Sequence, residues 1–82
     1  MLKPTVLKLA NIYVPSKRRT TLDPPKVAEI AESILEKGQT TPILVREDGE
    51  RFVLVEGLHR LEACKSLGED TIRAFLVQAR RH

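Results

Sequence analysis

Residues 53–68, VLVEGLHRLEACKSLG, contain the transition that decides the fold. The stretch begins with aliphatic and β-branched residues, which are typical of a short buried strand, and Gly57 then interrupts the run. Apolar residues recur at helical spacing over 58–67, and Gly68 ends the pattern. The stretch therefore predicts a strand, a glycine turn and a helix that starts where the strand ends.

A second helix is predicted upstream. Asp23 is an N-cap residue followed by proline, and Gly38 is a typical C-terminal stop. Between them, apolar residues at i, i+3, i+4, i+7 and i+8 form one face of an amphipathic helix: Val27, Ile30, Ala31, Ile34 and Leu35.

Strands are predicted around this helix pair. Asp48-Gly49 is a tight hairpin signal, and a loop is predicted over 14–21. The predicted strands cover residues 6–12, 42–45, 52–55 and 71–77. The order β-α-β-β-α-β predicts an α+β domain in which a small mixed sheet packs with two helices.

Composition excludes several classes of protein. The chain has 82 residues, of which 41% are hydrophobic and 30% charged, so we expect one globular domain. One cysteine, Cys64, cannot form an internal disulfide, and two distant histidines give no zinc site, so no metal-ligating residues are predicted. Apolar runs are too short to span a membrane, and no secretory signal is visible, so a reducing cytoplasm is the expected compartment.

Charge is concentrated at one end of the chain. Residues 1–20 carry a net charge of +5 and no acid, whereas the remaining residues sum to −2. We divide the domain into a basic strand and loop (1–21), a core (22–78) and a polar tail (79–82). The basic segment indicates either an anionic partner, such as the DNA backbone, or a terminus that only aids solubility.

Arg60 is the residue in the second predicted helix that points to function. At 100° per residue it lies at about 200° from Leu58, within the apolar arc formed by positions 61, 63, 64 and 67. An arginine on the core side is costly unless an anion meets it, and the first helical turn adds free N–H groups and a positive dipole end. Together with Gly57, which lets a ligand approach closely, and His59, it predicts a phosphate site.

Simpler explanations stay open at this point. Arg60 could pair with Glu56 or another carboxylate and only stabilise the turn. Lys26 and Ser33 share a stripe with Lys37 along the edge of the first helix, where they could reach a polyphosphate or be ordinary solvated residues.

The same residues carry a family resemblance. The box Gly57-Leu58-His59-Arg60 with Ala63 resembles the G-x-H-R and G-x-x-R-x-x-A boxes of the ParB/sulfiredoxin superfamily. The resemblance extends over most of the chain, through Arg19–Asp23, Leu22–Val27, Thr41–Val45 and Thr71–Val77.

Members of this superfamily bind nucleotides, so the resemblance implies a nucleoside triphosphate, CTP or ATP, with Mg²⁺. By resemblance, Gly57, His59 and Arg60 would hold phosphates, and Leu58 would belong to the same nucleotide-binding box. Contacts from outside the box would come from Arg19, Lys26, Ser33 and Thr41.

Departures from the family pattern limit the function. Leu58 stands where sulfiredoxin has its catalytic cysteine, so sulfinic acid repair is not expected, and Cys64 is expected in the core. Glu29 replaces another nucleotide contact of sulfiredoxin, and Thr41 replaces a ParB glutamine.

Three functions follow. The first is a ParB-like nucleotide-binding module of a DNA-associated partition or regulatory system. A second copy of the chain, in a homodimer, is among its candidate partners. The second is an ATP-dependent phosphotransferase of the free-serine-kinase type, with Glu56 as its base. The third is an interaction domain whose nucleotide site has decayed. Whether the chain is an enzyme stays open.

Overall fold

The computed structural model describes residues 3–39 and 41–77, so the predicted polar tail (79–82) and residue 78 lie outside the described residues. The helices are α1 (Ser16–Arg19), α2 (Pro24–Lys37) and α3 (Leu58–Ser66), with a 3-10 helix, η1 (Leu9–Asn11). The strands are β1 (Thr5–Lys8), β2 (Ile12–Tyr13), β3 (Ile43–Asp48), β4 (Arg51–Glu56) and β5 (Thr71–Val77). The predicted α+β class with a mixed sheet is confirmed.

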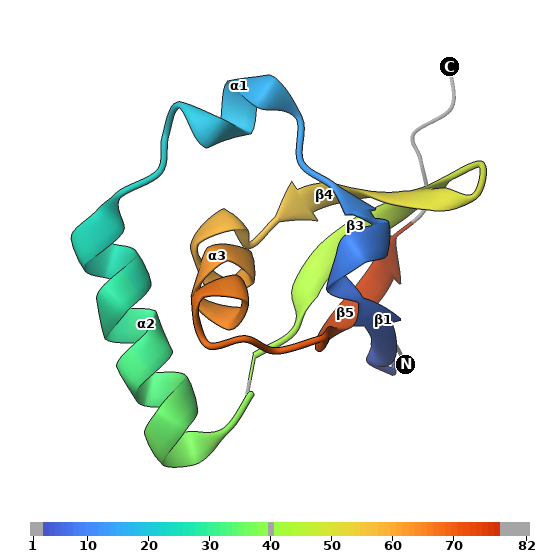
Figure 1. Cartoon of the computed structure of the whole chain (residues 1–82). Coiled ribbons are helices and arrows are strands. Elements are labelled where there is room, and N and C mark those ends of the chain that lie inside the picture. Colours follow the sequence, from blue (N-terminus) through green and yellow to red (C-terminus); the bar gives the residue numbers. More distant parts are fainter. Residues whose placement is uncertain (1–2, 40, 78–82) are drawn as a thin grey trace.

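The sheet has the strand order β1-β5-β3-β4-β2. β3 and β4 form an antiparallel hairpin in which Asp48 pairs with Arg51, as the Asp48-Gly49 signal predicts. β5 runs parallel to β3, and β1 adds an antiparallel edge to β5. Because β3 and β4 run in opposite directions, the start of β3 lies beside the end of β4, where α3 begins (Figure 1).

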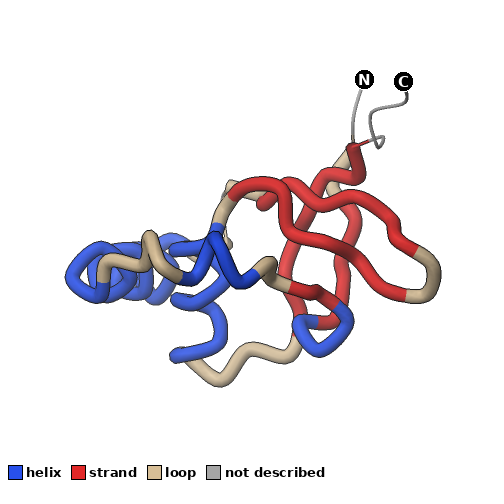
Figure 2. Tube along the Cα trace, turned by 90° about the horizontal axis from the view of Figure 1, so that it is seen from above, coloured by secondary structure: helices blue, strands red, loops and turns tan. Residues whose placement is uncertain are grey.

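The three α-helices lie together on one side of the molecule and the strands, with η1 between β1 and β2, on the other (Figure 2). α3 places Leu58, Leu61, Ala63 and Cys64 in the core, and the last three have no exposed surface. The sheet contributes buried aliphatic residues, among them Ile43, Val45, Leu54, Ile72 and Ala74. α2 lies outside α3 in Figure 1 and joins the core through Ile34, with Val27, Ile30 and Ala31 partly buried.

The prediction of one continuous strand over residues 6–12 is wrong. The segment 6–12 forms β1 and β2, which pair at opposite edges of the sheet and are separated by η1. The Leu9 N–H donates to the Asp70 carbonyl oxygen at 3.0 Å, outside the strand ladders. Leu9 and Ile12 are both buried across this turn, so apolar spacing alone did not distinguish a bent segment from one strand.

The predicted loop over 14–21 contains the short helix α1, which makes three α-helices rather than two. The hydroxyls of Thr20 and Thr21 donate to the carbonyl oxygens of Lys17 and Arg18, both at 2.8 Å. These local bonds satisfy carbonyls at the end of the helix, which ends four residues before Asp23.

The prediction that Leu35 belongs to the buried face of α2 is wrong, because this residue is 73% exposed. It lies about 80° around the helix from Val27, at the edge of the apolar stripe. α3 has only nine residues and covers the centre of the stripe, where Ile34 is 5% exposed.

Candidate functional site at the start of α3

Gly57 connects β4 to α3 in a conformation that other residues rarely adopt. Its φ of +113° lies in the left-handed region, and a Cβ added there would meet Ile43 Cγ2 at 2.6 Å. The structure thus gives this glycine a packing role that the sequence analysis did not predict. It lets the first turn of α3 approach the start of β3.

Arg60 is half-buried and lines a pocket of about 330 Å³, a volume within the range of small-ligand sites. The pocket lies where the start of β3, the end of β4 and the first turn of α3 meet, beside β5. Its lining residues are Thr41, Pro42, Ile43, Leu44, Glu56, Gly57, Arg60 and Phe75.

The structure contradicts the alternative in which Glu56 neutralises Arg60. Both residues line the pocket, but within residues 3–39 and 41–77 no ion pair joins them. The guanidinium is therefore available to an anion. A carboxylate on the same wall makes the pocket electrostatically mixed.

The first turn of α3, which begins beside this pocket, has free backbone donors. The Leu61 N–H donates to the Gly57 carbonyl oxygen at 2.9 Å, which is the first turn of the α-helical pattern. The preceding N–H groups of the helix have no partner within it, and no side chain of the described residues caps them. Free amides, the positive end of the helix dipole and Arg60 all favour an anion at this point.

Phe75, Pro42 and Leu44 are pocket residues that the sequence analysis missed. The sequence of β5 carried a signal, because apolar Ile72 and Ala74 follow polar Thr71 and Arg73 in alternation, and the structure buries both apolar residues. That period of two places Phe75 on the other face of the sheet. The pocket thus combines a polar end at Arg60 with an apolar side that could accept a flat ring.

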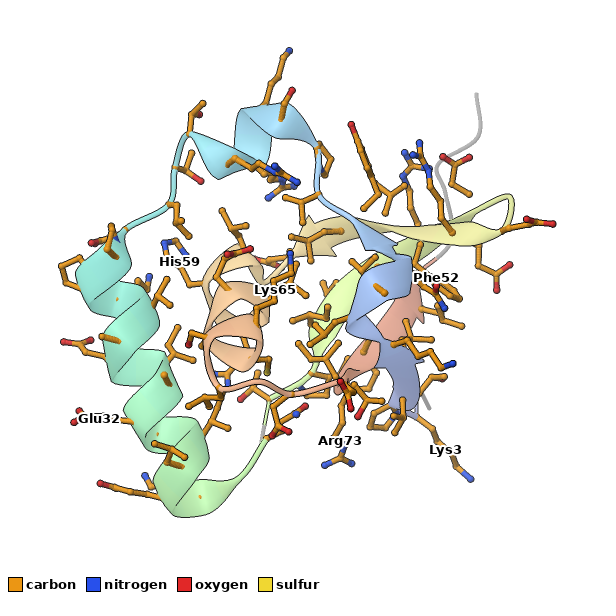
Figure 3. All side chains as sticks on the ribbon, in the orientation of Figure 1. Lys3, Glu32, Phe52, His59, Lys65 and Arg73 are labelled. Carbon is orange, nitrogen blue, oxygen red and sulfur yellow. The ribbon has the colours of Figure 1, made fainter. Side chains whose placement is uncertain are left out.

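The His59 side chain points toward α2. Its Nε2 accepts a hydrogen bond from the Asp23 N–H at 3.0 Å, so the neutral ring carries its proton on Nδ1. Figure 3 shows His59 between α2 and α3. The ring connects the N-cap of α2 to the first turn of α3, and its Nδ1–H remains a donor.

The structure does not bring every predicted contact into the Arg60 pocket. Thr41, Glu56, Gly57 and Arg60 line it, whereas Arg19, Lys26 and Ser33 do not. Lys26 and Ser33 are exposed on α2, the helix next to His59, and Arg19 ends α1. Their contacts with a nucleotide remain predictions. Leu58, in the position of the sulfiredoxin cysteine, is buried at 7% exposure.

Cys64 is fully buried, as the helical arc predicts. Burial raises the pKa of its thiol, Glu69 raises it further, and Arg60 opposes both with a smaller effect. The neutral thiol is thus the stable form, which suits a core residue better than a nucleophile.

We expect Cys64 in the folded domain to react with iodoacetamide at pH 8 at least about 100-fold more slowly than in the unfolded chain. Because its folded pKa is raised, stability also falls as the pH rises above about 8.5, where the unfolded thiol ionises first. Mass spectrometry and pH-dependent denaturation measure both effects. Fast alkylation of the native domain would contradict this assignment.

Within the described ranges, no three His, Cys, Asp or Glu side chains gather into a metal-binding group. In the same part of the chain, no helix is both long enough and apolar enough to cross a membrane.

Residues 3–82 match the family described as the ParB N-terminal domain. The chain belongs to this family. It is 39% identical over 63 residues to a probable chromosome-partitioning protein ParB of Campylobacter jejuni, an alignment covering 77% of this chain and 23% of the relative. The chain spans about a quarter or less of the length of the curated ParB relatives it matches.

Solved structures share the fold. Sulfiredoxin from Arabidopsis thaliana superposes with a TM-score of 0.81 at 34% identity, covering 96% of this ParB N-terminal domain and 86% of sulfiredoxin. A truncated ParB from Caulobacter crescentus in complex with CTP-gamma-S gives 0.81 at 23% identity, covering 95% and 46%. A free serine kinase in complex with ADP gives 0.77 at 17% identity, covering 90% and 30%. The last two identities establish likeness of fold alone.

Proposed function

We propose that this ParB N-terminal domain binds a nucleoside triphosphate, CTP or ATP, with its phosphates at the start of α3. One observation carries the proposal. Arg60 lines an open pocket beside the free first-turn amides of α3 and has no ion pair among the described residues. A half-buried guanidinium next to a helix N-terminus is suited to a phosphate, which it can contact through two parallel hydrogen bonds.

Other residues extend the proposed site in two directions. Thr41 lines the same pocket, where Phe75 offers an apolar surface to a base or ribose. His59 offers its Nδ1–H, and Lys26 in the first turn of α2 supplies a cation close in sequence to Asp23, the partner of His59. Mg²⁺ would be held through the phosphates and would neutralise part of their charge. The fold shared with the CTP-gamma-S complex of ParB supports this site.

A thermal-shift screen with CTP, ATP and GTP, each with and without Mg²⁺, tests the proposal. At 100 times Kd a ligand adds about 2.7 kcal/mol to the free energy of unfolding. In a domain of this size that raises Tm by about 10 °C or more. We expect such a shift with CTP or ATP. No shift with any nucleotide, repeated by calorimetry, would support a decayed site instead.

The wider role we propose is a nucleotide-responsive module of a DNA-associated partition system. The ParB relative is named for chromosome partitioning, and the described basic residues near the N-terminus include Lys17, Arg18 and Arg19, all exposed on α1. Such a cluster suits contacts with DNA phosphates, which hold a protein on DNA without identifying its sequence.

A second candidate is a phosphotransferase, because Glu56 lines the same pocket as Arg60. Its carboxylate would accept the proton of a serine hydroxyl while that oxygen attacks the γ-phosphorus of ATP and ADP leaves. Incubating the protein with ATP and free serine distinguishes the phosphotransferase from the binding module. Release of ADP and phosphoserine over many turnovers would favour the enzyme, and binding without turnover favours the module.

A further inference from the structure

The side chain of Gln39, in the loop between α2 and β3, is hydrogen-bonded to β5. Its Nε2 donates to the Thr71 carbonyl oxygen at 3.2 Å, and its Oε1 accepts from the Arg73 N–H at 3.2 Å. The Arg73 guanidinium also donates to the Gln39 carbonyl oxygen at 3.5 Å. Figure 3 labels Arg73 on β5. Two residues of the strand therefore hold both ends of the carboxamide and the backbone of Gln39.

The carboxamide bonds have the pattern of a parallel β-ladder. In such a ladder a residue donates to the residue before its partner and accepts from the residue after it. The two strand residues that contact Gln39 flank Ile72, so the carboxamide occupies the place of a residue paired with Ile72. In the register of β3 with β5, Ile43 pairs with Ala74. If this register continued two residues toward the N-terminus, Thr41 would pair with Ile72.

A side chain that takes this place leaves Thr41 outside the sheet. The pairing of β3 with β5 begins at Ile43 in the described residues. Thr41 and Pro42 line the pocket of Arg60 instead. A Thr41 that continued the strand would use its N–H and carbonyl in the ladder, since each backbone group needs a partner when buried. The bonds of Gln39 therefore satisfy β5 while Thr41 and Pro42 form part of the pocket wall.

We propose that Gln39 is a positioning residue. Its carboxamide replaces the backbone of Thr41 in the ladder and fixes the Thr41–Pro42 segment as one wall of the Arg60 pocket. The consequence for ligand affinity rests on the proposed nucleotide function. The wall itself is a property of the free protein.

The substitution Gln39→Ala tests the inference, with Glu36→Ala as the matched control. Glu36 is exposed in the last turn of α2 and lies outside the pocket lining. We expect Gln39→Ala to lower the affinity for the nucleotide that binds best about tenfold. Tm should move by only a few degrees, because Gln39 contributes no side chain to the core. Gln39→Glu should lose affinity likewise, since a carboxylate cannot donate to Thr71.

Hydrogen exchange separates positioning from a general loss of structure. In Gln39→Ala the Arg73 amide should exchange faster, while the Phe75 amide further along the same ladder should not. The Thr41 amide resonance of the free protein should shift in this variant and not in Glu36→Ala. Unchanged Arg73 protection, or unchanged affinity once that amide is freed, would overturn the inference. If the wild type binds no nucleotide, the proposed function fails, and the Arg73 and Thr41 signals alone decide whether Gln39 holds the wall.

Discussion

Replacing Arg60 with alanine lowers the affinity of the domain for CTP or ATP about 100-fold or more and leaves the domain folded. A hydrogen bond to a charged group contributes about 1.5–3 kcal/mol, and a guanidinium can make two such bonds with one phosphate. The fold should persist because Arg60 lines a pocket, has no ion pair among the described residues and is not part of the buried cluster. Calorimetric titration and circular dichroism measure the two effects.

Two further variants sharpen this test. Arg60→Lys keeps the charge but not the planar fork, so it should retain intermediate affinity. Arg51→Ala is the matched control, because Arg51 lies at the opposite end of β4, paired with Asp48 at 3.3 Å and 4.2 Å above the ring of Tyr13. Equal affinities for Arg60→Ala and wild type would remove Arg60 from the site.

Replacing Gly57 with alanine lowers the free energy of unfolding by about 2–4 kcal/mol, and Gly57→Val leaves little folded protein. Two causes add. A left-handed φ strains any residue with a Cβ, and this Cβ would meet Ile43 Cγ2 at 2.6 Å and Ile43 Cβ at 2.9 Å. Ile43 is 1% exposed, so the surrounding core gives it little room to move.

Gly68→Ala is the matched control for Gly57. Gly68 has a φ of +75°, but nothing lies within 4 Å of the position of its Cβ, so the substitution introduces backbone strain alone. Urea denaturation should show a clearly larger loss for Gly57→Ala, and the difference reports the Ile43 contact together with the larger φ of Gly57. Equal losses in the two variants would show that Ile43 relaxes freely.

Local signals in the sequence predict most of the fold. Proline after Asp23 and glycine at position 38 delimit α2, and helical spacing predicts the buried side of α3, where Leu61 and Cys64 are completely covered. These features depend on residues within a few positions of one another. The split of the first strand escaped prediction because a turn between Leu9 and Asn11 sends its halves to opposite edges of the sheet.

The candidate site is only partly local. The first turn of α3 and Arg60 follow from spacing after a glycine, but the walls of the pocket come from β3 and β5, distant in sequence. His59 meets the Asp23 N–H across 36 residues, and Gln39 meets Thr71 across 32. Pairings at such separations are set by the packing of whole elements, and no motif around either residue indicates them.

A nucleotide phosphate bound at the start of α3 can be detected by an NMR titration of the ¹⁵N-labelled domain. With CTP or ATP and Mg²⁺, the amide signals of Leu58, His59 and Arg60 should shift saturably, while Lys65 in the last turn of α3 shifts little. The shifts should vanish in Arg60→Ala. Saturable binding that leaves the amide signals of the first turn of α3 unshifted, or that shifts only those of the basic residues of α1, would exclude a phosphate site at this helix.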